Sequence, residues 1–175
     1  SGTDQAIHAA RYDGGVWQLP VPIDVRADAS LYYPEVEYAD DHGRRVAVCY
    51  TSYLNAVSDT IVYAAHSDDG GVSFQAPGSF PGIPSTSGGS MLSSDRRGNG
   101  WVAGPEKPGY TPRSMVVARS SDGGAHFGVP RKLDHREPPG VYYSGTIDFA
   151  STEAAALPGV GIFAYTGRHD SQWDD

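Results

Sequence analysis

An eight-residue segment occurs twice in this chain and constrains its fold more than any other feature. The first copy is Ser67-Asp-Asp-Gly-Gly-Val-Ser-Phe74 and the second is Ser120-Ser-Asp-Gly-Gly-Ala-His-Phe127. A shorter, altered copy, Asp13-Gly-Gly-Val-Trp17, precedes both. A segment that returns with a period of about 50 residues is typical of a repeat protein. The chain is therefore expected to consist of repeated structural units.

Each copy lies between an apolar run and a short run that ends in proline, which predicts a turn between two antiparallel strands. The Gly-Gly pair supplies the positive φ values that a tight turn requires. Serine and aspartate side chains can accept hydrogen bonds from nearby backbone amides and so fix the turn. The Phe or Trp that follows is expected to pack its ring beneath it.

Four strands are expected in each unit, and the high content of glycine (22), proline (13) and tyrosine (11) fits such an all-β chain. Four-stranded repeats of this length are typical of the blades of a β-propeller. We therefore predict one domain, 1–175, with blades at 31–80 and 88–134 and a third blade shared between 1–24 and 141–175. The expected strands are 33–39, 45–52, 60–66 and 74–80; 90–95, 101–104, 114–120 and 127–132; 6–11 and 17–23; and 145–151 and 159–166.

Three blades cannot close a ring, since propellers typically have four to eight. One hypothesis is that two chains pair as a homodimer, each completing the divided blade of the other, to give six blades with two-fold symmetry. The alternative is that a second half-propeller chain, or further sequence of the same protein, completes the ring. Either would cover the sheet edges and apolar faces that a half-ring leaves exposed.

Composition excludes several classes of function. The formal net charge is −8, which argues against nucleic acid and anionic membranes as partners. No apolar stretch approaches the roughly 20 residues of a membrane span. The single cysteine, Cys49, excludes a disulfide framework and is expected to be a buried strand residue. His8, His66 and His126 lie in or next to repeat positions but lack metal-ligand spacing, so we expect no metal site and no cofactor.

The repeated octapeptide resembles the Asp-box, or BNR repeat, of the sialidase (neuraminidase) superfamily. The resemblance covers the two complete copies, the altered copy and the strands around them. It implies a propeller in which these turns lie at the rim away from the ligand face. It also implies that two sets of residues are structural: Ser67, Asp69, Gly71 and Phe74, and Ser120, Asp122, Gly124 and Phe127.

The same resemblance implies a secreted protein that acts on glycans. Sialidases hold the sugar carboxylate with three arginines and use a tyrosine nucleophile, activated by glutamate, with an aspartate as acid and base. The Arg-Ile-Pro segment of the family is absent from this sequence, and no clear three-arginine pattern is present. The sequence therefore leaves the activity open.

Candidate aromatic ligand-binding residues lie where the first strands of two predicted blades begin, at the mouth of the central channel. Aromatic rings there can stack on the apolar face of a sugar, although packing between blades is the alternative. Arginines could hold an anionic group, although a solvated position is the alternative for each. The predicted ligand-binding residues are Tyr32, Tyr33, Tyr142, Arg113 and Arg168.

Catalytic candidates are Glu35 and Asp148, which are acidic residues in or beside apolar runs, and Tyr143. Burial of such a carboxyl would alter its pKa and suit it to general acid catalysis, whereas a capped or solvent-facing residue is the alternative. The sequence thus predicts a carbohydrate-recognising propeller, with glycoside hydrolysis once the ring is complete. The alternatives are an exo-sialidase acting on terminal sialic acids and a non-catalytic scaffold that binds protein partners.

Overall fold

A computed structural model describes residues 4–27, 29–54, 59–80, 91–105 and 115–132, together with four short strands at 141–142, 148–150, 162–164 and 168–169. All regular secondary structure in these residues is β-strand, and every pairing is antiparallel. No helix that could cross a membrane occurs in this part of the chain. The protein is therefore all-β with antiparallel sheets, as predicted.

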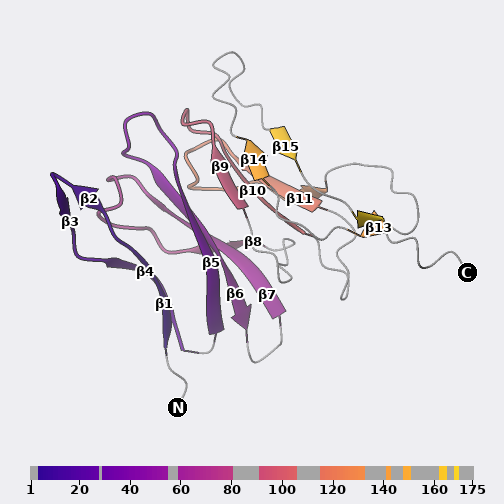
Figure 1. Ribbon diagram of the computed structural model, residues 1–175, viewed down its shortest axis with the longest axis horizontal. Helices are drawn as coiled ribbons and strands as arrows, with labels where there is room; N and C mark the ends of the chain where they lie inside the picture. Colours follow the sequence, from indigo (N-terminus) through magenta and orange to yellow (C-terminus); the bar gives the residue numbers. More distant parts are fainter. Residues whose placement is uncertain are drawn as a thin grey trace, which may run out of the picture.

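Two four-stranded sheets form the main body (Figure 1). Each has its strands in sequence order, so each is a simple meander. The first sheet contains β5 (Ala29–Tyr38), β6 (Val46–Leu54), β7 (Asp59–Ser67) and β8 (Gly78–Phe80), and the second contains β9 (Met91–Ser94), β10 (Gly100–Pro105), β11 (Met115–Ser120) and β12 (Arg131–Lys132).

The other strands form two-stranded sheets. In the N-terminal part, β1 (Gln5–Ala9) pairs with β4 (Val21–Arg26), and β2 (Tyr12–Asp13) pairs with β3 (Val16–Trp17). In the C-terminal part, β14 (Asp148–Ala150) pairs with β15 (Ile162–Ala164), and β13 (Val141–Tyr142) pairs with β16 (Arg168–His169). The predicted hairpin of 145–151 with 159–166 is thus present over its central residues.

The divided blade is not assembled in the described residues. The predicted N-terminal pair forms the β1–β4 sheet and the predicted C-terminal pair forms the β14–β15 sheet, and these are two separate sheets. β1 contacts β5, whereas β14 contacts β9. The expectation that the two pairs make one four-stranded blade therefore remains a hypothesis about the completed assembly.

Strand β6 is the centre of the fold because it is buried on both faces. Side chains alternate along a strand, so its even-numbered and odd-numbered residues face different layers. Val46, Val48 and Tyr50 form an apolar core with Ile7 of β1 and Ile23 of β4. On the opposite face, Ala47 and Cys49 join Val62 and Ala64 of β7 in a second core with β9, β10 and β11. Cys49 is fully buried there, as expected.

The two complete octapeptide turns share the hydrogen bonds made by their serine. In the first, the Ser67 hydroxyl donates to Asp69 Oδ1 (2.7 Å) and accepts from the Gly71 amide (2.8 Å). In the second, the Ser120 hydroxyl donates to Asp122 Oδ1 (2.7 Å) and accepts from the Gly124 amide (2.9 Å). Both serines are buried. The motif residues thus satisfy each other's polar groups and fix the turn.

The aromatic residue of each complete turn packs as predicted. Phe74 packs against the core between the β1–β4 sheet and the first four-stranded sheet. Phe127 packs against the core between the two four-stranded sheets. Each octapeptide therefore seals the junction between its own sheet and the preceding one.

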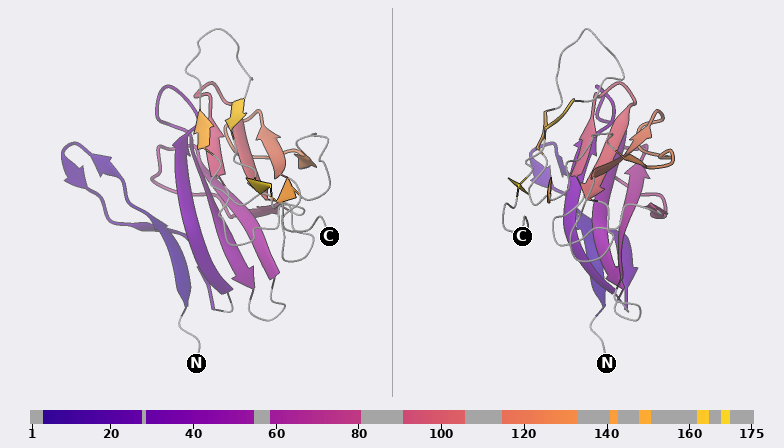
Figure 2. Two further views of the ribbon diagram at one scale, coloured as in Figure 1. Left: turned by 45° about the vertical axis from the view of Figure 1, so that its right-hand side comes forward. Right: turned by 90° about the vertical axis from the view of Figure 1, so that its right-hand side faces the viewer.

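The altered N-terminal copy forms a different structure. Arg11 stands where the complete copies have serine, and its guanidinium donates to Asp13 Oδ2 at 2.7 Å. A two-residue Gly14-Gly15 turn then joins β2 to β3, and Trp17 is 67% exposed. Figure 2 shows this hairpin extending from the body as an arm.

Backbone hydrogen bonds join turns within each unit and, at one point, between units. The Gly70 amide donates to Arg44 O within the first unit, and the Gly123 amide donates to Gly98 O within the second. The Gly98 amide donates to Ala39 O and so joins the second unit to the first. At the first strands, β5 contacts β9 and β9 contacts β14. Successive units are therefore neighbours through their first strands and through their turns.

Candidate functional site

A bulge in strand β5 places two of the predicted tyrosines together. Tyr32 pairs with Thr51 and Glu35 pairs with Cys49, so Tyr33 and Pro34 lie opposite one residue of β6. Tyr33 has φ of 53°, which is the left-handed region. This conformation is unfavourable for a tyrosine, and a following proline makes it more so. Backbone strain of this kind is concentrated at functional sites, where the surrounding structure maintains it.

The bulge has a direct consequence for the two aromatic rings. In a regular strand, consecutive side chains point to opposite faces. Here the ring centroids of Tyr32 and Tyr33 are 6.0 Å apart with an interplanar angle of 42°. The two residues are 46% and 54% exposed. They form a small aromatic surface on β5, the first strand in the order of the first sheet.

Glu35 follows the bulge and reaches across to the next sheet. Its Oε2 accepts a hydrogen bond from the Leu92 amide of β9 at 2.7 Å. Burial raises the pKa of Glu35 above its ordinary value, and the bond from Leu92 opposes part of that rise. Burial also raises the pKa of Glu37, and Arg96 opposes this while Glu35 adds to it. The edge strand thus carries two half-buried carboxyl groups beside its tyrosines.

The remaining predicted site residues lie in or near the C-terminal strands. Tyr142 in β13 is the direct pairing partner of Arg168 in β16. Asp148 begins β14, which contacts β9. Tyr143 and Arg113 lie outside the described residues. The structure therefore brings Tyr32, Tyr33 and Glu35 together on β5, and Tyr142 and Arg168 together on a separate ribbon.

A polar cluster between β4 and the first sheet was not predicted. Asp24 Oδ2 accepts from Arg26 Nε and from the Tyr50 hydroxyl, both at 2.6 Å. The Arg26 guanidinium lies 3.9 Å from the centroid of the Tyr63 ring, which stacks on Tyr50. Burial and the bond to Asp24 raise the pKa of Tyr50. The separation of Asp24 and Arg26 by two residues, which puts both on one face of a strand, was the available signal.

Two buried hydroxyls near the bulge have no hydrogen-bond partner among the described residues. They are Thr51 Oγ1 and Ser52 Oγ of β6, opposite Tyr32 and Leu31. A buried hydroxyl without a partner costs about 1–3 kcal/mol. Sequence pattern gave no sign of them, because Thr and Ser are ordinary strand residues.

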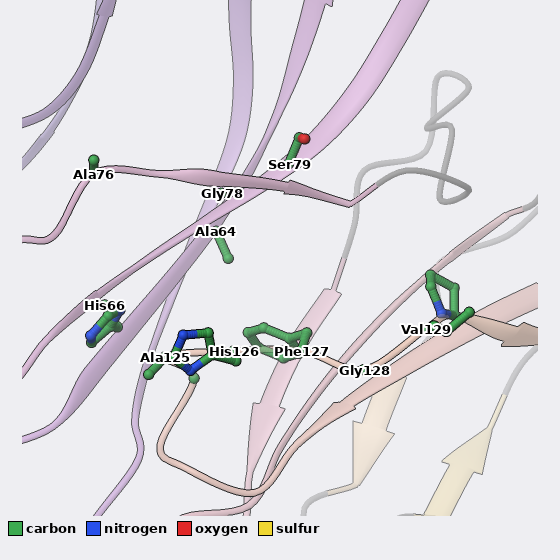
Figure 3. Close-up of a pocket in the computed structure, with 12 residues that line it drawn as sticks. Ala64, His66, Ala76, Gly78, Ser79, Ala125, His126, Phe127, Gly128 and Val129 are labelled. Carbon is green, nitrogen blue, oxygen red and sulfur yellow. The ribbon is translucent and has the colours of Figure 1, made fainter.

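A pocket lies on the other edge of the first sheet, where β8 ends the strand order (Figure 3). Its volume is about 530 Å³. Residues of β7 and β8 line one side, and the segment that follows Asp122 lines the other. His66 and His126, which the sequence placed at repeat positions, both contribute to it.

No group of three or more His, Cys, Asp or Glu side chains arranged for a metal ion occurs in the part of the chain that the structure describes.

Comparisons with known proteins give no assignment. No family model, no curated protein and no solved structure matches this chain.

Proposed function

We propose that this chain is part of a sialidase-type β-propeller that recognises carbohydrate through Tyr32, Tyr33 and Glu35. Support for the architecture comes from two meander sheets of four strands, each with a Ser–Asp turn between its third and fourth strands. The contacts of β5 with β9 and of β9 with β14 suit first strands that surround a common axis.

The tyrosine bulge is the observation that most supports carbohydrate as the ligand. Two exposed rings, held together by a left-handed residue, offer an apolar surface on which a pyranose ring can stack. Their hydroxyls and the carboxyl of Glu35 can bond sugar hydroxyls. Few residues other than aromatics would give this combination of apolar area and polar tips at so low an entropic cost.

The test is binding to a glycan array that contains sialosides, with wild type, Tyr33→Gly and Tyr38→Ala. Glycine removes the ring and relieves the left-handed strain, so Tyr33→Gly should lose binding without losing stability. Tyr38 is 54% exposed on the same strand, and its replacement should leave binding unchanged. Wild-type binding that survives Tyr33→Gly would contradict the proposal, as would the absence of any glycan binding.

Glycoside hydrolysis is the second candidate, and the raised pKa of Glu35 favours it. A carboxyl that keeps its proton at higher pH can donate it to a leaving sugar oxygen. In a fluorogenic sialoside assay, Glu35→Gln should abolish turnover, because the amide can still accept from the Leu92 amide but cannot donate an acidic proton. Tyr143→Phe and Asp148→Asn belong in the same assay, and normal rates in all three variants would exclude these roles.

The partner that completes the ring is a second half-propeller, from a second copy of this chain or from further sequence. The separate β1–β4 and β14–β15 sheets and the exposed side chains of the N-terminal hairpin support this. The exposed residues are Tyr12, Val16, Trp17 and Leu19. They also favour the third candidate, a scaffold for protein partners. Native mass spectrometry separates the assemblies, since a homodimer has twice the mass of the 18.6 kDa chain.

A further inference from the structure

The pocket beside β8 is chemically distinct from the tyrosine surface and lies across the sheet from it. β5 is the first strand and β8 the last in the order of the first sheet, so β6 and β7 separate the two places. Figure 3 shows His66, His126 and Phe127 in one row along the pocket, with Gly78 and Ser79 of β8 along its other side. None of the described residues that line the pocket has a fixed charge.

The imidazole of His126 has a defined hydrogen-bonding state. Its Nδ1 lies 2.7 Å from Asp122 Oδ2. Burial acts to raise the pKa of Asp122, but hydrogen bonds from the His126 amide and ring and from the Ser120 hydroxyl lower it to about 2. The carboxylate is therefore ionised and can only accept, so Nδ1 donates. In the neutral ring, Nε2 is then left as an acceptor.

His66 approaches the same arrangement. Its Nε2 lies 3.6 Å from Asp68 Oδ2, which is an electrostatic contact too long for a hydrogen bond. The side chain of His66 is 19% exposed, whereas that of His126 is 87% exposed. The pocket thus has one shielded imidazole and one open imidazole, each beside a carboxylate of its own turn.

The floor of the pocket is apolar. Phe127 packs on the core with one part of its surface and lines the pocket with another, next to Ala64. An aromatic ring with neighbouring polar acceptors, in a pocket of some hundreds of cubic ångströms, is a common arrangement for an uncharged polar ligand. The small side chains of the walls leave room for a ring-shaped ligand above Phe127.

We infer that this pocket binds one unit of a neutral sugar, with the pyranose ring against Phe127, a hydroxyl that donates to Nε2 of His126, and His66 beside the same ligand. An anionic sugar is disfavoured because Asp68 and Asp122 stand behind the two imidazoles. The inference shares its ligand class with the proposed function but uses none of the same residues. It adds a second, neutral-sugar site on the opposite edge of the first sheet.

The test uses saturation-transfer NMR and titration of the intact protein with methyl α-mannoside, methyl β-galactoside, methyl α-glucoside and N-acetylglucosamine. At least one of these probes should bind. Gly78→Leu should abolish the binding by filling the pocket, and the fold should tolerate it, since a Cβ at Gly78 meets no atom within 4 Å. Val72→Ala, at an exposed valine of the other turn, is the control and should bind like wild type.

A second variant tests the imidazole without disturbing the turn. Ser73 Oγ donates to Asp69 Oδ2 at 2.6 Å in the first turn, which is the bond that His126 makes in the second. His126→Ser should therefore keep the turn but weaken binding by roughly threefold to tenfold, the loss of one hydrogen bond.

Four outcomes decide between the two sites. Loss of neutral-sugar binding in Gly78→Leu but not in Tyr33→Gly supports the inference. If neutral-sugar binding is lost in Tyr33→Gly but not in Gly78→Leu, the inference of a second site is overturned and the proposed function remains intact. Sialoside binding without any neutral-sugar binding does the same. Neutral-sugar binding that is unaffected by Gly78→Leu also overturns it.

Discussion

The two complete octapeptide turns share a sequence motif and an internal hydrogen-bond network but differ in what surrounds them. A Cβ placed at Gly124 would lie 2.7 Å from Ala47 Cβ of the first sheet. A Cβ at the equivalent Gly71 would meet only Phe74 of its own turn, at 4.0 Å. The internal network is thus a local property of the motif, whereas the close packing depends on the unit that precedes the turn.

The difference follows from what lies before each turn. The second turn packs against a complete four-stranded sheet, and Ala47 belongs to the second strand of that sheet. The first turn packs against the two-stranded β1–β4 sheet, which offers Ile7 and Ile23 but no equivalent of β6. A motif can therefore fix a turn on its own, but a tight junction requires a full neighbouring sheet.

The largest expected effect tests that packing directly with Gly124→Ala and Gly71→Ala. Both glycines have positive φ, 88° and 84°, so each substitution carries a backbone cost of about 1–2 kcal/mol. Only Gly124→Ala adds a steric clash, worth about 1–3 kcal/mol more. Urea denaturation should show that Gly124→Ala lowers the free energy of unfolding by about 2–5 kcal/mol, and that Gly71→Ala lowers it only by the backbone cost. Equal losses in the two variants would show that the junctions are equally tight.

The second prediction tests the shared network with Ser67→Ala and Ser120→Ala. Each change removes a buried hydroxyl that donates to an aspartate and accepts from a glycine amide. The two hydrogen bonds that each variant loses contribute about 0.5–1.5 kcal/mol each. The two variants should lose equal stability, within about 0.5 kcal/mol, in the same denaturation experiment. A markedly smaller loss for Ser67→Ala would mean that the network, and not only the packing, depends on the neighbouring sheet.

Local pattern was sufficient to predict the strands and turns but not the junctions. The glycine pairs and apolar runs specified each hairpin, and most observed strands overlap the predicted ranges. The short strands β13 and β16 were not predicted, and β4 begins four residues later than predicted. The fourth strands are shorter than predicted: β8 begins at Gly78 and β12 at Arg131. The residues from each aromatic to the following proline instead pack against the core or bond once to the third strand, as the Gln75 amide does to His66 O.

The candidate site was predicted only in part, again because local pattern predicts neighbours in sequence but not contacts between sheets. Tyr32, Tyr33 and Glu35 are adjacent in sequence, so their proximity was predictable. The left-handed backbone of Tyr33 was not, because nothing in an aromatic residue before proline favours that conformation. The bond from the Leu92 amide to Glu35 joins different sheets, and strand periodicity carries no information about such contacts.

The third prediction concerns pH and both aspartates of the network. Hydrogen bonds from Ser73 lower the pKa of Asp69, and those in the second turn hold the pKa of Asp122 at about 2. A lowered folded-state pKa contributes stability above the ordinary aspartate value of about 3.9, and that stability is lost as pH falls toward the folded value. The urea concentration at the unfolding midpoint of wild type should therefore decrease as the pH is lowered from about 4 to about 2. Asp122→Asn should show a shallower fall, and an identical pH profile would exclude this contribution.

The smallest expected effect comes from exchanging the side chains at one position where the internal networks differ. Ser73 and His126 occupy the same place in the motif, and each donates a side-chain hydrogen bond to the outer oxygen of its aspartate. Both side chains are at the surface, where such bonds contribute little to stability. Ser73→His and His126→Ser should each change the free energy of unfolding by less than about 0.5 kcal/mol. A larger loss in His126→Ser alone would show that the imidazole also supports the junction with the first sheet, and the two turns would then differ in their internal networks as well as in their surroundings.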